Sequence, residues 1–173
     1  MNVFKKLFNK KKFIYDERLV DVPFLKKLKP RELGLFNRMI YKRNFKKGEI
    51  IFKKDYPNVV LYFLMKGTVQ ILLNNEKSIV ISELEPYSFF GELGMYIDTK
   101  RSASVVSKTD TELYAVSKDE FKHFVDTFPK IGVKILYALG QNMSKDIIKS
   151  NERLKECESK LKDKMSNDRY IQN

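Results

Sequence analysis

The sequence predicts an α+β fold in which a small antiparallel β-barrel or a jelly-roll-like sandwich is flanked by helices. Three observations predict it. Between Phe45 and Val116, short runs rich in β-branched and aromatic residues are separated by turn residues, as in many-stranded antiparallel folds. On both sides of this region, apolar residues recur at the spacing of a helix. One helix-compatible stretch after Phe90 interrupts the strands, so we expect a short helix within the β region.

Composition indicates one folded domain with extensions. The chain has 173 residues, of which 43% are hydrophobic and 13% aromatic, and this is enough for a substantial core. No apolar run is long enough to cross a bilayer, and lysines occupy the place where a signal peptide has its apolar segment. The single cysteine cannot form an internal disulfide, which suits a reducing compartment, so we expect a cytoplasmic protein.

The net charge of +12 is concentrated at the front of the chain. Residues 1–54 hold 17 Lys and Arg against 5 Asp and Glu, which leaves 17 of each kind for residues 55–173. Because this remainder is neutral, it lacks the charge of a nucleic-acid-binding domain, and we expect no specific DNA binding. We assign residues 1–21 to a basic N-terminal extension.

Residues 1–13 of this extension place Phe4, Leu7 and Phe8 on one helical face among lysines. One interpretation is a basic amphipathic segment that makes weak contact with an anionic membrane surface. The other, which we favour, is a solvated or docked tail without membrane affinity.

Residues 22–128 are predicted to form one domain. It opens with a helical pattern over Val22–Ile40, in which Pro30 suits a first helical position. Turn residues such as Gly48 and Gly67 then separate short β-patterned runs. The predicted strands are Ile50–Phe52, Val59–Met65, Thr68–Leu73, Ser78–Leu84, Ser102–Ser107 and Glu112–Val116.

The stretch from Phe89 to Val105 has the chemistry to hold a small anion. A helix that begins at Gly91 would point unpaired N–H groups at one spot, and Gly91 has no Cβ to keep a ligand away. Arg101 would add a fixed fork of donors that matches phosphate oxygens. Glu92 would repel a phosphate unless it accepts a hydrogen bond from a neighbouring hydroxyl, so a sugar phosphate suits the pair.

Two parts of this stretch resemble the phosphate-binding cassette of the cyclic-nucleotide-binding domain family. The first is Gly91-Glu92-Leu93, and the second is Arg101-Ser102-Ala103, which begins ten residues after Gly91. The residues from Phe45 to Phe52 are similar to the strand that begins this family's β-roll, and Leu61 to Val69 to its glycine-marked central hairpin. The resemblance covers residues 22–150, approximately. It implies a double-stranded β-helix (a jelly-roll-like β-barrel) with an N-terminal helical segment, a short cassette helix and a long C-terminal helix.

The resemblance also implies a ligand, cyclic AMP or cyclic GMP, and no further cofactor. Glu92 would accept a hydrogen bond from the ribose hydroxyl beside the cyclic phosphate, while Arg101 and nearby backbone amides would hold the phosphate oxygens. A serine after the arginine does not decide the base, although cyclic AMP is favoured. The implied ligand-binding residues are Gly91, Glu92, Leu93, Arg101, Ser102 and Ala103. Asn142 and Asp146 on the long helix are candidates for a base contact.

The chain departs from the family in two loops. The family usually has a glycine-acid turn before the cassette, where this chain has Tyr87-Ser88 after Pro86. The loop from Asp55 to Asn58 lacks the customary glycine as well. We expect both loops to be reshaped locally without loss of the pocket.

Two helices are predicted to end the chain. Ser117 and Glu120 form a capping-box pattern that begins the first helix, and a proline separates it from a longer one, assigned to residues 129–165 as a lid or dimerisation helix. A heptad stripe in the longer helix favours a homodimer through residues 136–161, the alternative being that its first half packs on the barrel and its second half is exposed. The stripe consists of Leu136, Gly140, Met143, Ile147, Ser150, Leu154, Cys157 and Leu161. Residues 166–173 are predicted to be a polar tail.

Nothing in the sequence indicates catalysis. Glycine-rich phosphate loops, nucleophile elbows and zinc-binding helix motifs are absent, and His123 is the one histidine. Only nine residues follow Lys164, so we expect a stand-alone sensor without a DNA-binding domain. We expect this sensor to bind a cyclic mononucleotide and to signal through its C-terminal helices to an unknown downstream protein. The alternatives are a ligand-free scaffold of the same fold and an adaptor that binds anionic membranes.

Overall fold

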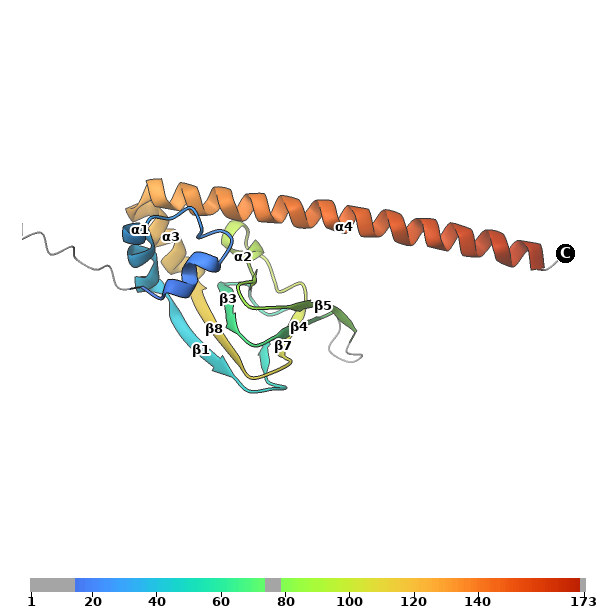
Figure 1. Ribbon diagram of the computed structural model, residues 1–173, viewed down its shortest axis with the longest axis horizontal. Helices are drawn as coiled ribbons and strands as arrows, with labels where there is room; N and C mark the ends of the chain where they lie inside the picture. Colours follow the sequence, from blue (N-terminus) through green and yellow to red (C-terminus); the bar gives the residue numbers. More distant parts are fainter. Residues whose placement is uncertain (1–14, 74–78, 172–173) are drawn as a thin grey trace, which may run out of the picture. The chain divides into compact units, whose positions relative to one another are not determined.

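The computed structural model describes residues 15–73 and 79–171 and divides into two compact units. The first ends at Ile135 and contains both sheets, and the second begins at Leu136 within the last helix. Figure 1 shows the helices and strands along the chain. The basic segment predicted over residues 1–13 and the turn at Asn74-Asn75 lie outside the described residues.

Two four-stranded antiparallel sheets form the β region (Figure 1). The first has the order β1-β8-β3-β6 and the second the order β2-β7-β4-β5. The strands are β1 (Tyr41–Phe45), β2 (Ile50–Phe52), β3 (Val60–Lys66), β4 (Val69–Leu72), β5 (Val80–Leu84), β6 (Phe89–Phe90), β7 (Ser104–Ser107) and β8 (Thr111–Ser117). The predicted α+β fold with a jelly-roll-like β region is confirmed, and its two sheets are not closed into one cylinder.

Apolar side chains from both sheets pack into one core. Leu64, Phe90 and Leu113 come from the first sheet, and Val69 and Val105 come from the second. None of the five is more than 5% exposed, and burial of a large apolar side chain stabilises a fold by about 1.5–3 kcal/mol. This shared core explains why period-two alternation predicts these strands, since one face of each strand must be apolar.

The segment before the sheets is only partly helical, in contrast to the helix predicted over Val22–Ile40. It contains the 3-10 helices η2 (Glu17–Asp21) and η3 (Asn37–Met39) and one α-helix, α1 (Pro30–Phe36), which has Pro30 at its first position. Between η2 and α1, Leu25 N donates to Val22 O at 2.9 Å and Leu28 N to Leu25 O at 2.9 Å. These successive tight turns bury apolar residues at three-residue spacing and therefore imitate a helical pattern.

Aromatic rings join this segment to the first sheet. The Phe24 ring lies 5.3 Å from that of Phe63 on β3 and 5.0 Å from that of Phe89 on β6. The Phe36 ring lies 5.8 Å from that of Phe124 in an edge-to-face arrangement. Such ring pairs are favourable beyond their buried area, so they fix the N-terminal segment on the outer face of this sheet.

Strand β1 is missing from the predicted set. Tyr41 to Asn44 are all exposed, so they carry no apolar alternation. Backbone pairing with β8 holds the strand instead, with Tyr41 opposite Ala115 and Phe45 opposite Thr111.

Two helices follow the sheets, as predicted. Helix α3 (Lys118–Thr127) is capped by Ser117, whose hydroxyl accepts a hydrogen bond from Glu120 N at 3.3 Å. Helix α4 (Pro129–Ile171) continues beyond the predicted end at residue 165, so residues 166–171 of the segment assigned to a polar tail are helical.

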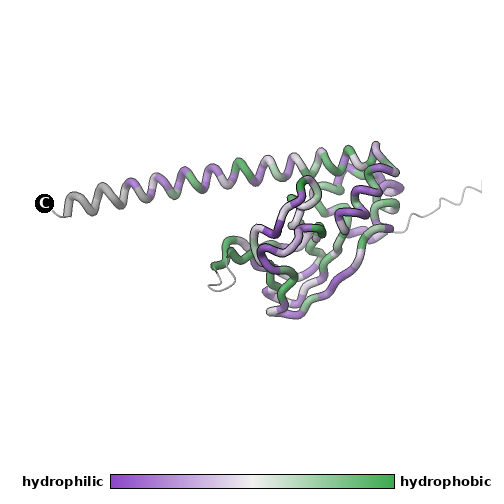
Figure 2. Tube along the Cα trace, turned by 180° about the vertical axis from the view of Figure 1, so that it is seen from behind, coloured by the Kyte–Doolittle hydropathy of each residue, from purple (hydrophilic) through white to green (hydrophobic). Residues whose placement is uncertain are grey.

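The second unit is the part of α4 from Leu136 onward. Figure 2 shows hydrophilic residues interrupting hydrophobic ones along this helix, and no helix in the described part of the chain is long and apolar enough to cross a membrane. Of the heptad stripe, Ile147 and Leu154 are both 59% exposed and Cys157 is exposed, whereas the Leu161 side chain lies outside the described ones. The homodimer stays a prediction.

Candidate functional site

The stretch predicted to hold an anion forms a sharp turn after β6. Gly91 has a φ of +85°, a left-handed conformation that L residues rarely adopt. A Cβ at this position would lie 2.3 Å from Arg101 Nη1 and 2.6 Å from Val60 O, so only glycine fits. The helix α2 (Leu93–Tyr96) begins two residues later than predicted, with Glu92 as its N-cap, and is a single turn long.

Arg101 is the buried cation of this turn. Its side chain is only 4% exposed, and Nη2 donates a hydrogen bond to Val60 O at 2.9 Å. Its Nε and Nη1 are buried and have no hydrogen-bond partner among the described residues. Burial lowers the pKa of the guanidinium, and the charges of Tyr62 and Glu92 oppose this shift. A buried cation with two unpaired donors favours an anionic oxygen beside it.

Aromatic rings support this guanidinium. Arg101 Cζ lies 3.9 Å from the centre of the Phe52 ring and 5.7 Å from that of Tyr62. The Tyr62 ring is stacked on Phe90 at 5.4 Å between ring centres, so the rings form a packed group. A desolvated cation–π contact contributes about 2 kcal/mol. The rings thus hold the positive charge in place without using its hydrogen-bond donors.

The loop from Asp55 to Asn58 holds the backbone around Arg101. Asp55 N donates to Arg101 O at 2.9 Å, Arg101 N to Tyr56 O at 2.8 Å, and Asn58 N to Thr99 O at 3.0 Å. Asp55 has a φ of +68°, and Tyr87, in the other loop that lacks the family's glycine, has a φ of +70°. Non-glycine residues therefore take a left-handed backbone in both loops, and the reshaping of these loops relative to the family stays a prediction.

The structure brings all six predicted ligand residues together around one cavity of about 120 Å³. Arg101 and Ala103 are buried, Gly91 and Glu92 are half-buried, and Leu93 and Ser102 are exposed. The cavity is lined by Phe52, Asn58, Ile71, Phe90, Gly91, Glu92, Leu93, Arg101, Ser102, Ala103 and Val105. Its apolar wall, buried cation and neighbouring carboxylate suit a ligand that has an anionic group, a hydroxyl and an apolar surface.

Asn58 is the polar lining residue that sequence reasoning did not find. Its side-chain Oδ1 is buried and accepts no hydrogen bond from the described residues. In the sequence it is one of several turn residues beside Pro57, and no signal separates it from them.

The predicted base contacts lie in the second unit. Asn142 Nδ2 donates to Ala138 O at 2.7 Å within α4, and Asp146 is exposed on the same helix. Both residues belong to the second unit and the cavity to the first, so their contact with a base stays a prediction.

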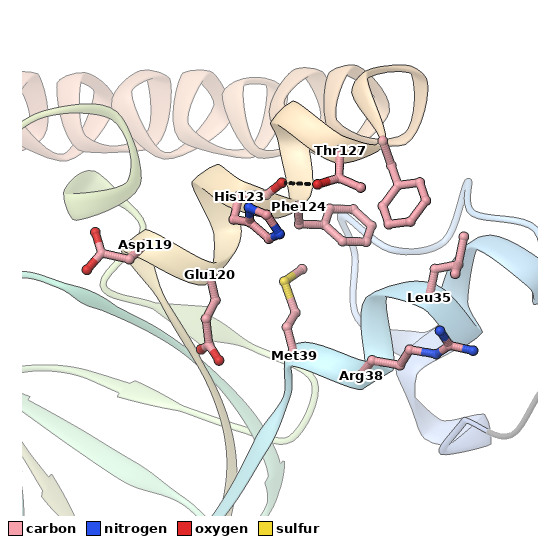
Figure 3. Close-up of a pocket in the computed structure, with 9 residues that line it drawn as sticks. Leu35, Arg38, Met39, Asp119, Glu120, His123, Phe124 and Thr127 are labelled. Atoms are coloured by element: carbon pink, nitrogen blue, oxygen red, sulfur yellow. Dashed lines mark hydrogen bonds between the residues drawn. The ribbon is translucent and has the colours of Figure 1, made fainter.

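A larger groove of about 440 Å³ lies elsewhere in the first unit (Figure 3). Apolar side chains of Leu35, Met39 and Phe124 line it, and Thr127 Oγ1 donates to His123 O at 2.8 Å. Among the described residues that line this groove, every buried polar side-chain atom has a hydrogen-bond partner. Its size exceeds that of the smaller cavity, but its chemistry gives no comparable indication of a ligand.

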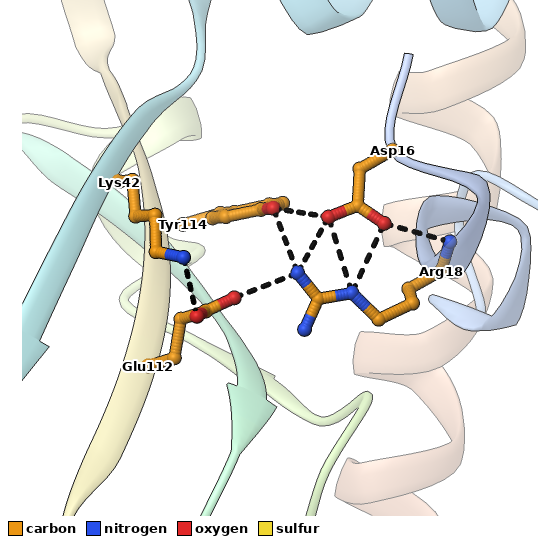
Figure 4. A network of polar contacts seen from close by, with 5 residues as sticks. All are labelled: Asp16, Arg18, Lys42, Glu112 and Tyr114. Atoms are coloured by element: carbon orange, nitrogen blue, oxygen red, sulfur yellow. Dashed lines mark hydrogen bonds and ion pairs between the residues drawn. The ribbon is translucent and has the colours of Figure 1, made fainter.

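A polar network near the start of the described chain has a structural role (Figure 4). Arg18 donates to Asp16 and Tyr114, and its Nη2 lies 2.7 Å from Glu112 Oε1, while Lys42 Nζ lies 2.5 Å from Glu112 Oε2. The hydrogen bond from Arg18 is the main reason that the pKa of Asp16 is lowered to about 2. Because these groups pair with one another, the network fixes η2 on β8, and buried polar atoms without a partner do not occur among its described side chains.

No cluster of three metal-ligating side chains occurs among the residues whose side chains the structure describes. His123 lies exposed on α3.

This chain is similar to known proteins over much of its length. Residues 42–128 match the family model described as "Cyclic nucleotide-binding domain". A cAMP-dependent protein kinase regulatory subunit of Emericella nidulans is 30% identical over 112 residues, which cover 65% of this chain and 27% of that protein. The human cGMP-dependent protein kinase 2 is 28% identical over 102 residues, which cover 59% of this chain and 13% of that protein. This chain thus spans less than a third of either relative.

Among solved structures, a cyclic nucleotide-binding domain from Methylobacillus flagellatus superposes with a TM-score of 0.72 at 21% identity. The match covers 79% of this chain and 80% of that one. At this identity the likeness shows that the fold is shared.

Proposed function

This chain belongs to the cyclic nucleotide-binding domain family, and on that premise we propose that it is a receptor for a cyclic mononucleotide, with cyclic AMP preferred over cyclic GMP. The fold of this family is regulatory and not catalytic. One observation carries the proposal: the buried Arg101 guanidinium faces the cavity with two unpaired donors, beside the glycine turn that the family uses for phosphate.

In this proposal the cyclic phosphate accepts hydrogen bonds from Arg101 Nε and Nη1 and from backbone amides near Gly91, Leu93 and Ser102 or Ala103. The Glu92 carboxylate accepts a hydrogen bond from the ribose hydroxyl. Hydrogen bonds to charged groups contribute roughly 1.5–3 kcal/mol each. Several of them, less the cost of ordering the ligand, suit micromolar affinity, or about −8 kcal/mol.

Two neighbouring carbonyls offer a route from this site to the helices. Val60 O accepts from Arg101 Nη2 at 2.9 Å, and Val59 O accepts from Lys118 N, the first residue of α3, at 2.9 Å. A phosphate that moves the guanidinium therefore acts on the strand end that also holds α3. A ligand transmits a signal in this way only if it prefers one arrangement of the helices.

Calorimetric titration of cyclic AMP and cyclic GMP into the wild-type chain and into Arg101→Ala tests the proposal. We expect micromolar binding by the wild type, tightest with cyclic AMP, and a loss of at least about tenfold in Arg101→Ala. Arg38→Ala, which replaces an exposed arginine on η3, is the matched control and should bind as the wild type does. No heat with either nucleotide would refute the receptor assignment and favour the ligand-free scaffold.

The finer points of the proposal have their own tests. A stand-alone role in the cytoplasm predicts that the native protein fractionates from cell extract as a small soluble species. Vesicle co-sedimentation of the chain with and without residues 1–13 tests the weak membrane contact. The downstream partner and a homodimer through residues 136–161 are separate predictions.

A further inference from the structure

Asn58 is held firmly between the two ends of the predicted cassette. Its backbone N–H donates a hydrogen bond at 3.0 Å to the carbonyl oxygen of Thr99, which precedes Arg101 by two residues. On the other side its carbonyl touches α2, because a Cβ built on Gly94 would lie only 1.9 Å from Asn58 O. The residue is 5% exposed, so its side chain has little freedom to turn towards solvent.

The side-chain Oδ1 of Asn58 lacks a hydrogen bond in this buried position. Leaving such a group unpaired costs about 1–3 kcal/mol, so a native structure rarely keeps one without a reason. Within the described residues, the other buried side-chain atoms without a partner are Arg101 Nε and Nη1. All three belong to residues that line the same cavity.

These three atoms differ in what they require. The two guanidinium N–H groups need an acceptor, which an anionic oxygen supplies, whereas an amide oxygen needs a donor. A bare oxyanion would satisfy Arg101 and leave Asn58 unpaired. A ligand that combines an anionic oxygen with an O–H or N–H group would satisfy both.

We propose that Asn58 is a further ligand-binding residue, whose Oδ1 accepts a hydrogen bond from the ribose hydroxyl or the exocyclic amino group of the bound cyclic nucleotide. The proposal rests on the receptor function above and adds to it a residue that discriminates between ligands. A ligand without the donor leaves the buried amide oxygen unpaired, so the site should bind it more weakly than the parent nucleotide.

The test is a titration of Asn58→Ala and the wild type with three ligands. These are the tighter-binding of cyclic AMP and cyclic GMP, its 2′-deoxy analogue, and its analogue without the exocyclic amino group. Asn44→Ala, at an exposed asparagine of β1, is the matched control, and thermal unfolding of each variant checks the fold.

We expect Asn58→Ala to lower the affinity for the parent nucleotide by about three- to tenfold, while the melting temperature of the variant stays close to that of the wild type. With the analogue that lacks the donor to Asn58, the wild type and Asn58→Ala should bind equally. Unchanged affinity for the parent nucleotide would overturn the inference. An equal loss for all three ligands would also overturn it, since the amide would then act on the phosphate or on the fold. Absence of binding by the wild type would instead refute the receptor function itself.

Discussion

Replacing Gly91 with alanine adds a single methyl group, yet it should lower both the stability of the fold and the affinity of the site. The residue has a φ of +85°, and the added methyl would lie 2.3 Å from Arg101 Nη1 and 2.6 Å from Val60 O. The guanidinium would have to leave Val60 O, to which its Nη2 now donates at 2.9 Å. The backbone carbonyl has no comparable freedom to move.

The expected loss of stability has three parts. A left-handed conformation costs an L residue roughly 1–2 kcal/mol. Alanine recovers about 0.4–1 kcal/mol by restricting the unfolded chain. Loss of a hydrogen bond from the charged Arg101 costs about 1.5–3 kcal/mol. We therefore expect Gly91→Ala to lower the free energy of unfolding by about 2–4 kcal/mol and cyclic nucleotide affinity by at least about tenfold.

Gly48→Ala is the matched control. Gly48 has almost the same φ, +87°, but a Cβ there would meet no atom within 4 Å. Gly48→Ala should therefore lower the free energy of unfolding by only about 1 kcal/mol and bind the nucleotide as the wild type does. Urea unfolding followed by circular dichroism gives the stabilities, and calorimetry gives the affinities. If the two variants lost equal stability and both bound normally, the steric account of Gly91 would be wrong.

Three further perturbations test other parts of the structure. Tyr87→Gly should stabilise the fold by about 0.5–1 kcal/mol in urea unfolding, because it relieves a φ of +70°; a loss would mean that the ring contributes more than the strain costs. Asp16→Asn should lower the free energy of unfolding by about 1 kcal/mol at neutral pH, once solvent screening of this partly exposed carboxylate is taken into account. Since the fold lowers the pKa of Asp16 from 3.8 to about 2, this contribution is present above pH 4, approximately, and is lost as the pH falls towards 2; a difference from wild type that stayed constant over that range would contradict it. Leu154→Asp should turn a homodimer into a monomer in sedimentation velocity, and a monomeric wild type would rule out the predicted seam.

The sequence predicts the parts of this fold whose burial leaves a periodic trace. Strand β3, which begins with alternating half-buried and buried residues, lies one residue from its predicted bounds, and the Ser117 cap begins α3 as its capping box indicates. Strand β1 leaves no such trace, since its first four residues are exposed and only backbone pairing holds it. The stretch from Val22 to Leu28 misleads in the opposite way, because tight turns there bury residues at helix-like spacing.

The candidate site follows the same division. Gly91 and Arg101 could be predicted because glycine allows a close approach to the backbone and arginine supplies a fork of donors for an anion, and because their spacing resembles that of a known cassette. Asn58 could not, because its importance lies in an unpaired atom that only three-dimensional packing reveals. The support of Arg101 by Phe52 and Tyr62 is likewise a contact between separate strands, which no local pattern encodes.

The unpaired donors of Arg101 also bear on how any measured affinity should be interpreted. A buried guanidinium attracts small oxyanions in general, so phosphate or sulfate in a buffer would compete with the nucleotide for the same two N–H groups. Competition of this kind raises the apparent dissociation constant linearly with the concentration of the competing salt. The proposed receptor would then bind its nucleotide weakly in one buffer and tightly in another, and inside a cell its response would depend on the concentration of free phosphate.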